Sequence, residues 1–424
     1  MSVVIIGGGW AGCAAALAAK NIGSDAILLE RTDALLGTGL VGGIFRNNGR
    51  FTAAEELIAM GGGDMIRAMD ETSRHKNFSF PGHAHVSVYD VNLIETKVRN
   101  LLTSQGVDLR LEQRIVDVEV NSGVIVSVAT ESGEKIKGDV FVDATGTFGP
   151  QGNCAKYGKG CAMCVLRCPS YGPRVSIAGK AGITEIAGEK EDGTLGSISG
   201  SCKLGKDSIS KEIVEELEKK GSMVIPLPQE LINKGRLSSK ACQQYALAAF
   251  AENLVLIDSG HVKLMSPYFH LRELHSIKGF ENARFVDPYA GSKGNSVRFL
   301  AMSPRDNSLK VTGLKNLFCG GEKAGLIVGH TEAIITGTLA GYNAARTASG
   351  HTPLNLPENT LLGDFVNFSW EMTQDKAKRK NRCTFSGSIY FERMKEKGMY
   401  ITDPTIIRKN VSTAGMIDIF LKKN

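Results

Sequence analysis

The first 30 residues alternate between apolar runs and glycine-rich turns. Residues 3–6 form a β-branched run that predicts a buried strand, and residues 26–29 repeat the pattern. Between them, residues 11–21 are mostly small and predict a closely packed helix, which Gly23 ends. Strands that alternate with helices in this way are typical of a parallel sheet covered by helices. We therefore expect a doubly wound α/β protein.

The same patterns continue along the chain. Glycines at residues 61–63 interrupt a helical stretch over residues 51–71, and alternation around His83 and His85 predicts a strand with both imidazoles on one side. An amphipathic helix is expected over residues 238–251. The other expected elements are strands at residues 107–111, 139–143 and 316–319, a hairpin of 114–120 and 124–130, helices at 91–105, 210–220 and 330–346, and a mainly helical region after residue 357.

A dinucleotide-binding fingerprint connects the first strand to the first helix. Gly7 permits the tight turn, Gly9 lets the backbone approach a pyrophosphate, and Gly12 lets the helix pack against the strand. The free N–H groups and the positive end of the helix would bind the phosphates. Glu30 follows about 20 residues later, where a carboxylate accepts hydrogen bonds from ribose hydroxyls, and this acid argues against a 2′-phosphate.

Composition indicates a globular protein of more than one domain, because 42% of the 424 residues are hydrophobic and 22% are charged. No apolar run reaches the roughly 20 residues that span a bilayer, and the first residues form a strand rather than a signal peptide. We therefore expect a cytoplasmic protein without a membrane partner. The net charge of +6 does not by itself indicate nucleic-acid binding, although the basic residues within 376–382 fit either an RNA surface or a solvated helix face.

Two later segments extend the pattern of the fingerprint. Residues 140–146 end in Ala144-Thr145-Gly146, and residues 314–322 end in Gly321-Glu322. Together the three segments resemble the glutathione-reductase-type flavoproteins, in which the second segment returns beside FAD and the third contacts its ribityl chain. The resemblance covers most of residues 1–350 and implies FAD as the cofactor.

Within that superfamily, residues 316–346 resemble the glucose-inhibited division protein A family, which modifies the wobble uridine of tRNA. The same run and residues 277–288 are also similar to the folate- and FAD-dependent tRNA uracil methyltransferases, and residues 356–365 resemble the start of their C-terminal region. Those relatives carry a cysteine in the loop after the second strand, and a thiolate is the group that attacks the base. Residues 32–50 of this chain contain no cysteine, which favours general oxidoreductase chemistry over uracil methylation.

The resemblance implies an FAD-binding domain in two parts, residues 1–170 and 310–350, an inserted α+β substrate domain at 171–309, and a helical C-terminal region at 351–424. The expected cofactor-binding residues lie mainly on the three turns, on the glycine-rich loop after the second strand and at the start of the late helix. They are Gly7, Gly9, Trp10, Ala11, Gly12, Glu30, Arg31, Thr38, Gly39, Arg114, Ile115, Ala144, Thr145, Gly146, Gly321, Glu322, Gly329, His330 and Thr331.

Candidate catalytic groups surround the start of the late helix. His330 would either act at the flavin or cap the helix, and Lys323 would either lie over the ring or be solvated. The positive helix end would stabilise the anionic reduced ring. For the substrate, Lys293, Asn295 and Arg298 belong to a polar, glycine-rich loop that would bind an anionic group, although a surface role explains Arg298 equally well.

Four cysteines lie close together, at Cys154, Cys161, Cys164 and Cys168. Their spacing and final Cys-Pro resemble the end of a bacterial ferredoxin motif, so a [4Fe–4S] cluster is one interpretation. The second is a catalytic Cys161–Cys164 dithiol that exchanges electrons with the flavin, since nearby cationic side chains would lower the thiol pKa. The third is zinc or no ligand.

The sequence therefore predicts an FAD-dependent oxidoreductase that transfers electrons or a hydride. Its donor would be NAD(P)H or a protein, its partner a small-molecule substrate or a redox protein, and a homo-oligomer is an open expectation. Two alternatives remain, an RNA uracil-modifying enzyme that uses folate and FAD, and a flavin-bearing subunit of an electron-transfer complex.

Overall fold

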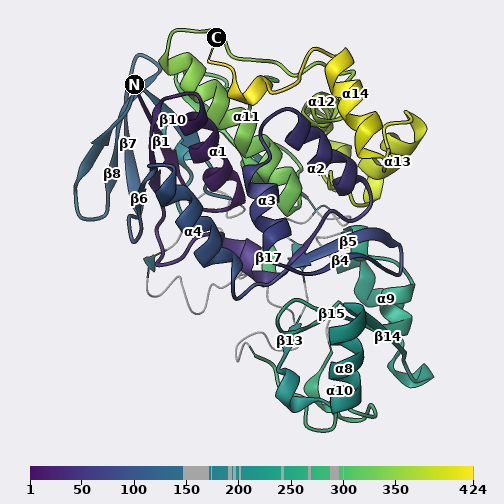
Figure 1. The fold of residues 1–424 in the computed structure, drawn as a ribbon. Helices are drawn as coiled ribbons and strands as arrows, with labels where there is room; N and C mark the ends of the chain where they lie inside the picture. The colour runs from purple at the N-terminus through teal and green to yellow at the C-terminus, as the bar shows by residue number, and fades with distance from the viewer. Residues whose placement is uncertain are drawn as a thin grey trace.

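The computed structural model describes residues 1–146, 171–172, 174–189, 193, 197–199, 202–239, 243–265, 269–286, 296–298 and 300–423. A parallel sheet lies beside α1, strands and helices from the middle of the chain form the lower part of the view, and the C-terminal helices lie at its right (Figure 1). This arrangement confirms the predicted α/β class. Within the described ranges, no helix combines the length and the apolar character that crossing a membrane requires.

The central sheet is parallel and has the strand order β19-β10-β1-β2-β6. Its strands are β1 (Ser2–Ile6), β2 (Asp25–Leu29), β6 (Asp108–Arg110), β10 (Val140–Asp143) and β19 (Leu317–Cys319). Strands β1 and β10 are almost entirely buried, which is why each appears in the sequence as a continuous apolar run. The three predicted glycine turns follow β1, β10 and β19, so the sheet brings them to one edge.

Two helices of small residues, α1 (Trp10–Asn21) and α11 (His330–Ala348), pack side by side (Figure 1). A Cβ on Gly337 would overlap the backbone of Ala11, and a Cβ on Gly341 would overlap the backbone of Ala15. Glycine at these positions lets the two helix backbones approach in parallel. The N-termini of both helices therefore point toward the same edge of the sheet as the three turns.

The first part of the chain adds helices and two small antiparallel sheets, with the predicted helix break and hairpin both confirmed. The helices are α2 (Gly49–Ala59), α3 (Asp64–Glu71) and α4 (Ile94–Ser104). One sheet contains β3 (Ile44–Phe45), β4 (Ser73–Phe80) and β5 (His83–Tyr89), and the other contains β7 (Ile115–Asn121), β8 (Val124–Thr130) and β9 (Lys135–Lys137).

The expectation that His83 and His85 share one side of a strand is wrong. His85 has a left-handed backbone (φ 57°), and the β4–β5 pairing is irregular, so the alternation of side chains does not hold. The buried ring of His83 packs against Tyr245, whereas the Nδ1 of His85 lies 3.3 Å from the side-chain oxygen of Asn77. The two imidazoles therefore have separate surroundings.

The middle of the chain forms an antiparallel sheet, β13-β16-β15-β14, with a buried core of its own. The strands are β13 (Cys202–Leu204), β14 (Ser222–Pro226), β15 (Asn253–Asp258) and β16 (Val262–Leu264), and the helices are α7 (Ile177–Lys180), α8 (Lys211–Lys220), α9 (Ala249–Glu252) and α10 (Leu271–His275). Two strand pairs complete this region, β11 (Ile186–Ala187) with β18 (Ala301–Met302) and β12 (Ser197–Ser199) with β17 (Ser296–Arg298).

The amphipathic helix expected over residues 238–251 is not formed in the described part of this stretch. The chain has only short helical turns there, η4 (Lys234–Ser239), η5 (Gln243–Tyr245) and α9. Distant segments hold η5, because the carbonyl of Gln244 accepts a hydrogen bond from His83 Nε2 at 3.1 Å and the Gln243 side chain bonds to the backbone of the C-terminal region. These tertiary contacts outweigh the local helical pattern.

The C-terminal region is mainly helical, as predicted, but its helices pack into the central core. They are α12 (Leu361–Gln374), α13 (Ser388–Glu396) and α14 (Pro404–Thr413). Phe365 and Tyr390 belong to the same buried cluster as strand β1. Glu56 on α2 accepts hydrogen bonds from the first two backbone N–H groups of α12, at 3.2 and 2.8 Å, so α2 caps that helix.

Candidate functional site

A long pocket begins at the edge of the sheet where the three glycine turns meet. At one end it is lined by the β1–α1 turn, Glu30 and residues 113–115. At the other end the lining residues include Gly42, Arg50, Gln244, Tyr245, Lys263, Met265, Gly329 and His330. Segments far apart in the sequence therefore form one continuous wall.

The β1–α1 turn has the geometry that the fingerprint predicts. Gly7 has φ 104°, and a Cβ there would overlap the carbonyl of Ala144, while a Cβ on Gly12 would overlap the carbonyl of Gly7. Gly9 is different, because it lines the pocket and no described atom beyond its chain neighbours lies within 4 Å of the Cβ position. This free space beside the N-terminus of α1 fits a pyrophosphate.

Glu30 is held in place at the end of β2. One carboxylate oxygen accepts a hydrogen bond from the backbone N–H of Gly8 at 2.7 Å, and the other accepts from the N–H and the hydroxyl of Thr32, each at 3.0 Å. The side chain is half-buried and lines the pocket. Its remaining lone pairs suit the hydroxyls of a ribose, as the fingerprint requires.

Aromatic side chains gather at the start of α11, where Trp10 and His330 line the pocket and Tyr89 packs against both. The buried hydroxyl of Tyr89 lies 2.6 Å from the carbonyl of Gly39, 2.8 Å from that of Gly42 and 3.1 Å from Nδ1 of His330. Burial raises the pKa of Tyr89, so the phenol keeps its single proton and donates it to a carbonyl. Nδ1 of His330 can then donate to the phenol oxygen, so this contact fixes the orientation of the imidazole.

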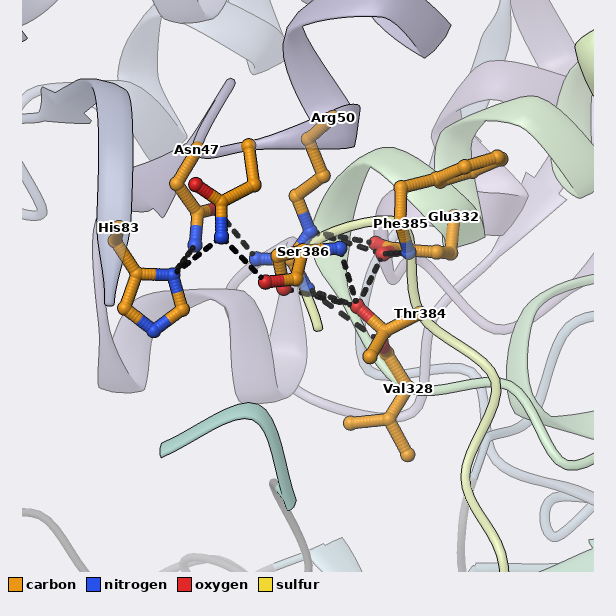
Figure 2. Close-up of polar contacts among 9 residues, drawn as sticks. Asn47, Arg50, His83, Val328, Glu332, Thr384, Phe385 and Ser386 are labelled. Atoms are coloured by element: carbon orange, nitrogen blue, oxygen red, sulfur yellow. Dashed lines mark hydrogen bonds and ion pairs between the residues drawn. The ribbon is translucent and has the colours of Figure 1, made fainter. Parts of the chain in front are cut away.

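Behind this wall lies a buried ion pair between Arg50 on α2 and Glu332 on α11 (Figure 2). Nε of Arg50 donates to both carboxylate oxygens at 2.9 and 3.0 Å, and the two side chains are 3% and 0% exposed. The same carboxylate accepts from the hydroxyl of Thr384 at 2.6 Å and from the N–H of Phe385 at 2.9 Å. The network therefore joins the start of α11 to a segment of the C-terminal region.

The guanidinium of Arg50 also faces the pocket and stays charged. Burial opposes its charge, but Glu332 and Tyr245 outweigh that effect, so the pKa of Arg50 lies above its ordinary value. A Cβ on Gly329 would overlap both members of the ion pair, and Gly329 has φ 142°. Glycine is therefore required at this position by the ion pair and by the backbone conformation.

His83 positions the part of the wall that comes from η5. Its Nε2 is 3.1 Å from the carbonyl of Gln244, so Nε2 carries the proton, and Nδ1 accepts from the side-chain amides of Asn47 (3.0 Å) and Asn48 (3.3 Å). Figure 2 shows Asn47 between His83 and Arg50. The imidazole thus links η5 to the Arg50 network.

The family model of glucose inhibited division protein A matches residues 2–270 and 260–352. The chain belongs to this family. The solved structure of Aquifex aeolicus GidA in its form II crystal matches 100% of this chain and 74% of that chain, with a TM-score of 0.68 at 17% identity. The form I crystal of the same protein matches 97% and 78%, with a TM-score of 0.58 at 16% identity. At these identities the likeness shows a shared fold.

Membership of the GidA family confirms the predicted superfamily and the prediction of an FAD-dependent enzyme. Most of the predicted cofactor-binding residues line the pocket, although their contacts with a cofactor stay predictions. Those that line it are Gly7, Gly9, Trp10, Ala11, Glu30, Arg31, Thr38, Arg114, Ile115, Ala144, Thr145, Gly146, Gly321, Glu322, Gly329 and His330. Gly12, Gly39 and Thr331 lie outside this lining, where Gly12 and Gly39 are packed against other parts of the wall and Thr331 is fully buried.

Of the two alternatives for Lys323, solvation is wrong, and the residue is not among those that line the pocket. It is 1% exposed and forms an ion pair with Glu185, and its Nζ donates to the hydroxyl of Ser176 at 2.9 Å. Burial opposes its charge, but Asp143 and Glu185 outweigh that effect and raise the pKa of Lys323. Its position is that of a structural ion pair, and the catalytic assignment gains no support.

Several predicted site residues of this GidA-family chain lie outside the described residues. They are Cys154, Cys161, Cys164, Cys168, Lys293 and Asn295; for Arg298, only the backbone in β17 is described. Within the described ranges, no three histidine, cysteine or acidic side chains are arranged to hold a metal ion. Cys13 and Cys319 are buried core residues, and burial raises the pKa of Cys319 to about 12.

Arg50, Tyr245 and Lys263 line the pocket and were not predicted. No glycine motif accompanies them, and their partners lie far away in the sequence, as with Arg50 and Glu332, 282 positions apart. For Lys263 the sequence holds one local signal, because a single cationic residue stands between the two buried apolar residues of β16. A charge within a buried strand indicates a partner or a site.

Proposed function

We propose that this chain is an oxidoreductase that holds FAD along the pocket, with the adenosine diphosphate half on the β1–α1 turn and the flavin ring at the start of α11. The observation that carries the proposal is the continuity of one pocket from Glu30 to His330. The space at Gly9 and the fixed carboxylate of Glu30 support the orientation, because they suit a pyrophosphate and a ribose at the first end.

When bound, FAD supplies the transfer of a hydride or of electrons, and the chain supplies position and electrostatics. The N-terminus of α1 binds the phosphates, and Glu30 orients the ribose by accepting its hydroxyl protons in hydrogen bonds. At the other end, the N-terminus of α11 places positive potential near the ring. His330 lines this end of the pocket, and the hydroxyl of Tyr89, 3.1 Å from Nδ1, fixes its imidazole.

The proposal also includes an electron donor and an electron acceptor for the flavin. NAD(P)H or a protein would reduce the flavin, and a small molecule or a redox protein would accept the electrons. The cysteines at 154, 161, 164 and 168, which follow the Ala144-Thr145-Gly146 turn in the sequence, would carry a [4Fe–4S] cluster or a redox dithiol. An anaerobic visible spectrum with iron and sulfide analysis tests the cluster, and a sample with neither element rejects it. We also propose that the protein is cytoplasmic and forms a homo-oligomer.

Family membership also favours a second candidate, an RNA uracil-modifying enzyme. Its support is the resemblance to the tRNA-modifying families together with exposed lysines at Lys376 and Lys378. Against it, the loop at residues 32–50 offers no cysteine for attack on the base. A tRNA-binding titration at low salt tests this candidate, because phosphate contacts are strongest there and weaken as salt rises. Absence of binding at low salt rejects it.

Two glycine variants test the assignment of the pocket to FAD. Gly9→Ala adds a methyl group where the described structure is empty, so we expect wild-type thermal stability of the apoprotein but at least tenfold weaker FAD binding. Gly12→Ala places its methyl group against the carbonyl of Gly7, so we expect a loss of about 1–3 kcal/mol of stability in the apoprotein itself.

The measurements are FAD titration by fluorescence quenching and thermal unfolding of the same samples. A wild-type preparation that takes up no FAD after reconstitution rejects the proposed function. Equal FAD affinity in Gly9→Ala and wild type rejects the placement of the pyrophosphate at Gly9. It does not reject FAD as the cofactor.

A further inference from the structure

Two lysines of the four-stranded antiparallel sheet reach toward the glycine loop at residues 37–43. Lys203 on β13 and Lys263 on β16 are register partners on neighbouring strands. Nζ of Lys203 donates to the carbonyl of Leu40 at 2.7 Å, whereas Nζ of Lys263 lies against Gly42, where a Cβ would overlap it. Like charges directly opposite each other on a sheet are destabilising, so the pair indicates a function for at least one of the two.

Lys263 is the member of the pair that faces the pocket. It lines the pocket and is 8% exposed, while Lys203 is not part of the lining. The carbonyl of Gly42 beside it lies 2.8 Å from the hydroxyl of Tyr89, which is 3.1 Å from Nδ1 of His330. Lys263 therefore stands at the same end of the pocket as the positive N-terminus of α11.

We propose that Lys263 stabilises the negative charge that two-electron reduction leaves on the flavin ring. The inference rests on the proposed function, since it assigns the ring to this end of the pocket. Reduction adds two electrons and one proton from the reductant, and the ring then carries one negative charge near its pyrimidine part. The ammonium of Lys263 keeps its own proton and acts through its charge, which is strong because the group is buried.

The geometry of Gly42 supports this role. Any side chain at this position would displace the ammonium, so the glycine leaves space for the cation as well as for the loop. The sheet that carries Lys263 comes from the middle of the chain, and the two parts that supply the glycine turns are its first and late segments. The middle region would thus tune the cofactor electrostatically from outside the fingerprint.

The test replaces each lysine in the full-length flavoprotein. Lys263→Gln removes the charge and keeps a polar side chain, Lys263→Met keeps an apolar one of similar length, and Lys203→Gln is the matched control on the facing strand. The readouts are FAD content, the midpoint potential from anaerobic dye equilibration, and the dissociation constant of sulfite. Sulfite adds its sulfur lone pair to N5 of the oxidised ring, forms an N–S bond and leaves an anionic ring, so it probes the same charge.

We expect both Lys263 variants to bind FAD, with sulfite binding at least tenfold weaker and reduction at least tenfold less favourable, which lowers the midpoint potential by about 30 mV or more. Lys203→Gln should change sulfite binding by less than twofold. Wild-type values in the Lys263 variants would overturn the inference while leaving FAD binding intact. Loss of FAD from both Lys263 variants but not from Lys203→Gln would also overturn it, because the lysine would then serve the oxidised cofactor.

Discussion

Glu332→Gln is expected to disrupt the polar network behind the pocket with little change in shape. The substitution removes the negative charge that faces Arg50 while the guanidinium stays buried at 3% exposure. The amide can replace some hydrogen bonds to Thr384 and Phe385 but cannot neutralise the arginine. Removing one partner of a buried ion pair costs about 3–5 kcal/mol, so we expect that loss in the free energy of unfolding.

The assay is urea unfolding followed by tryptophan fluorescence and circular dichroism. The chain has two tryptophans, Trp10 in the pocket wall and Trp370 on α12, so fluorescence reports the two regions that the network joins. Coincident transitions by the two methods would justify a two-state free energy. A loss of about 3–5 kcal/mol corresponds to an unfolding equilibrium shifted by roughly 150- to 5,000-fold.

The matched control is Glu392→Gln, which breaks an ion pair with Lys395 on the surface. The two side chains of that pair are 62% and 47% exposed. Exposed pairs contribute about 0–1 kcal/mol, so the control should unfold nearly as wild type does. If Glu332→Gln also loses less than about 1 kcal/mol, the network does not hold α11 to the C-terminal region, and the reasoning from burial is refuted.

Two further variants probe other buried carboxylates. Burial raises the pKa of Glu56 to about 7, so its folded form keeps a proton that the unfolded chain releases, and stability falls as pH rises from about 4.5 to 7. In urea titrations across this range, Glu56→Gln should reduce that fall by about 3 kcal/mol; equal slopes would contradict the assignment. Burial opposes the charge of Asp258, but His75, Lys206 and Arg74 outweigh it and lower the pKa, so its contribution is present above about pH 4 and is lost as pH falls. Asp258→Asn should lower the free energy of unfolding by about 1–3 kcal/mol in urea at pH 7. The loss is limited to this range because water can solvate the cations that lose the carboxylate. A wild-type midpoint would contradict this.

The sequence predicts the central sheet well because its signals are local. Strands β1 and β10 are buried on both faces and so appear as uninterrupted apolar runs, and α1 and α11 appear as helices of small residues because they touch. The stretch at residues 238–251 fails for the opposite reason. Its backbone is held by His83 and by the C-terminal region, and no pattern within the stretch records those partners.

The same division applies to the pocket. Gly7 and Gly12 are predictable because each packs against atoms of the same turns, and Gly9 because the fingerprint requires space for a pyrophosphate there. Arg50 and Lys263 are not predictable in this way, since a single cationic residue in a helix or a strand does not indicate which distant residue or ligand it faces. Only the fold brings them to one wall.

The end of the pocket built from glycine turns is the end that dinucleotide-binding folds share, so it determines which cofactor is held and says little about the reaction. The other end is built from long-range contacts, with Arg50 held by Glu332 and Lys263 brought in by a separate sheet. Side chains near the ring are those that tune the potential and the access of a flavin. With the ring placed as proposed, Arg50 and Lys263 are therefore the residues that we expect to distinguish this chain's reaction. A family member with the same turns but other groups at these positions should bind the same cofactor with a different potential.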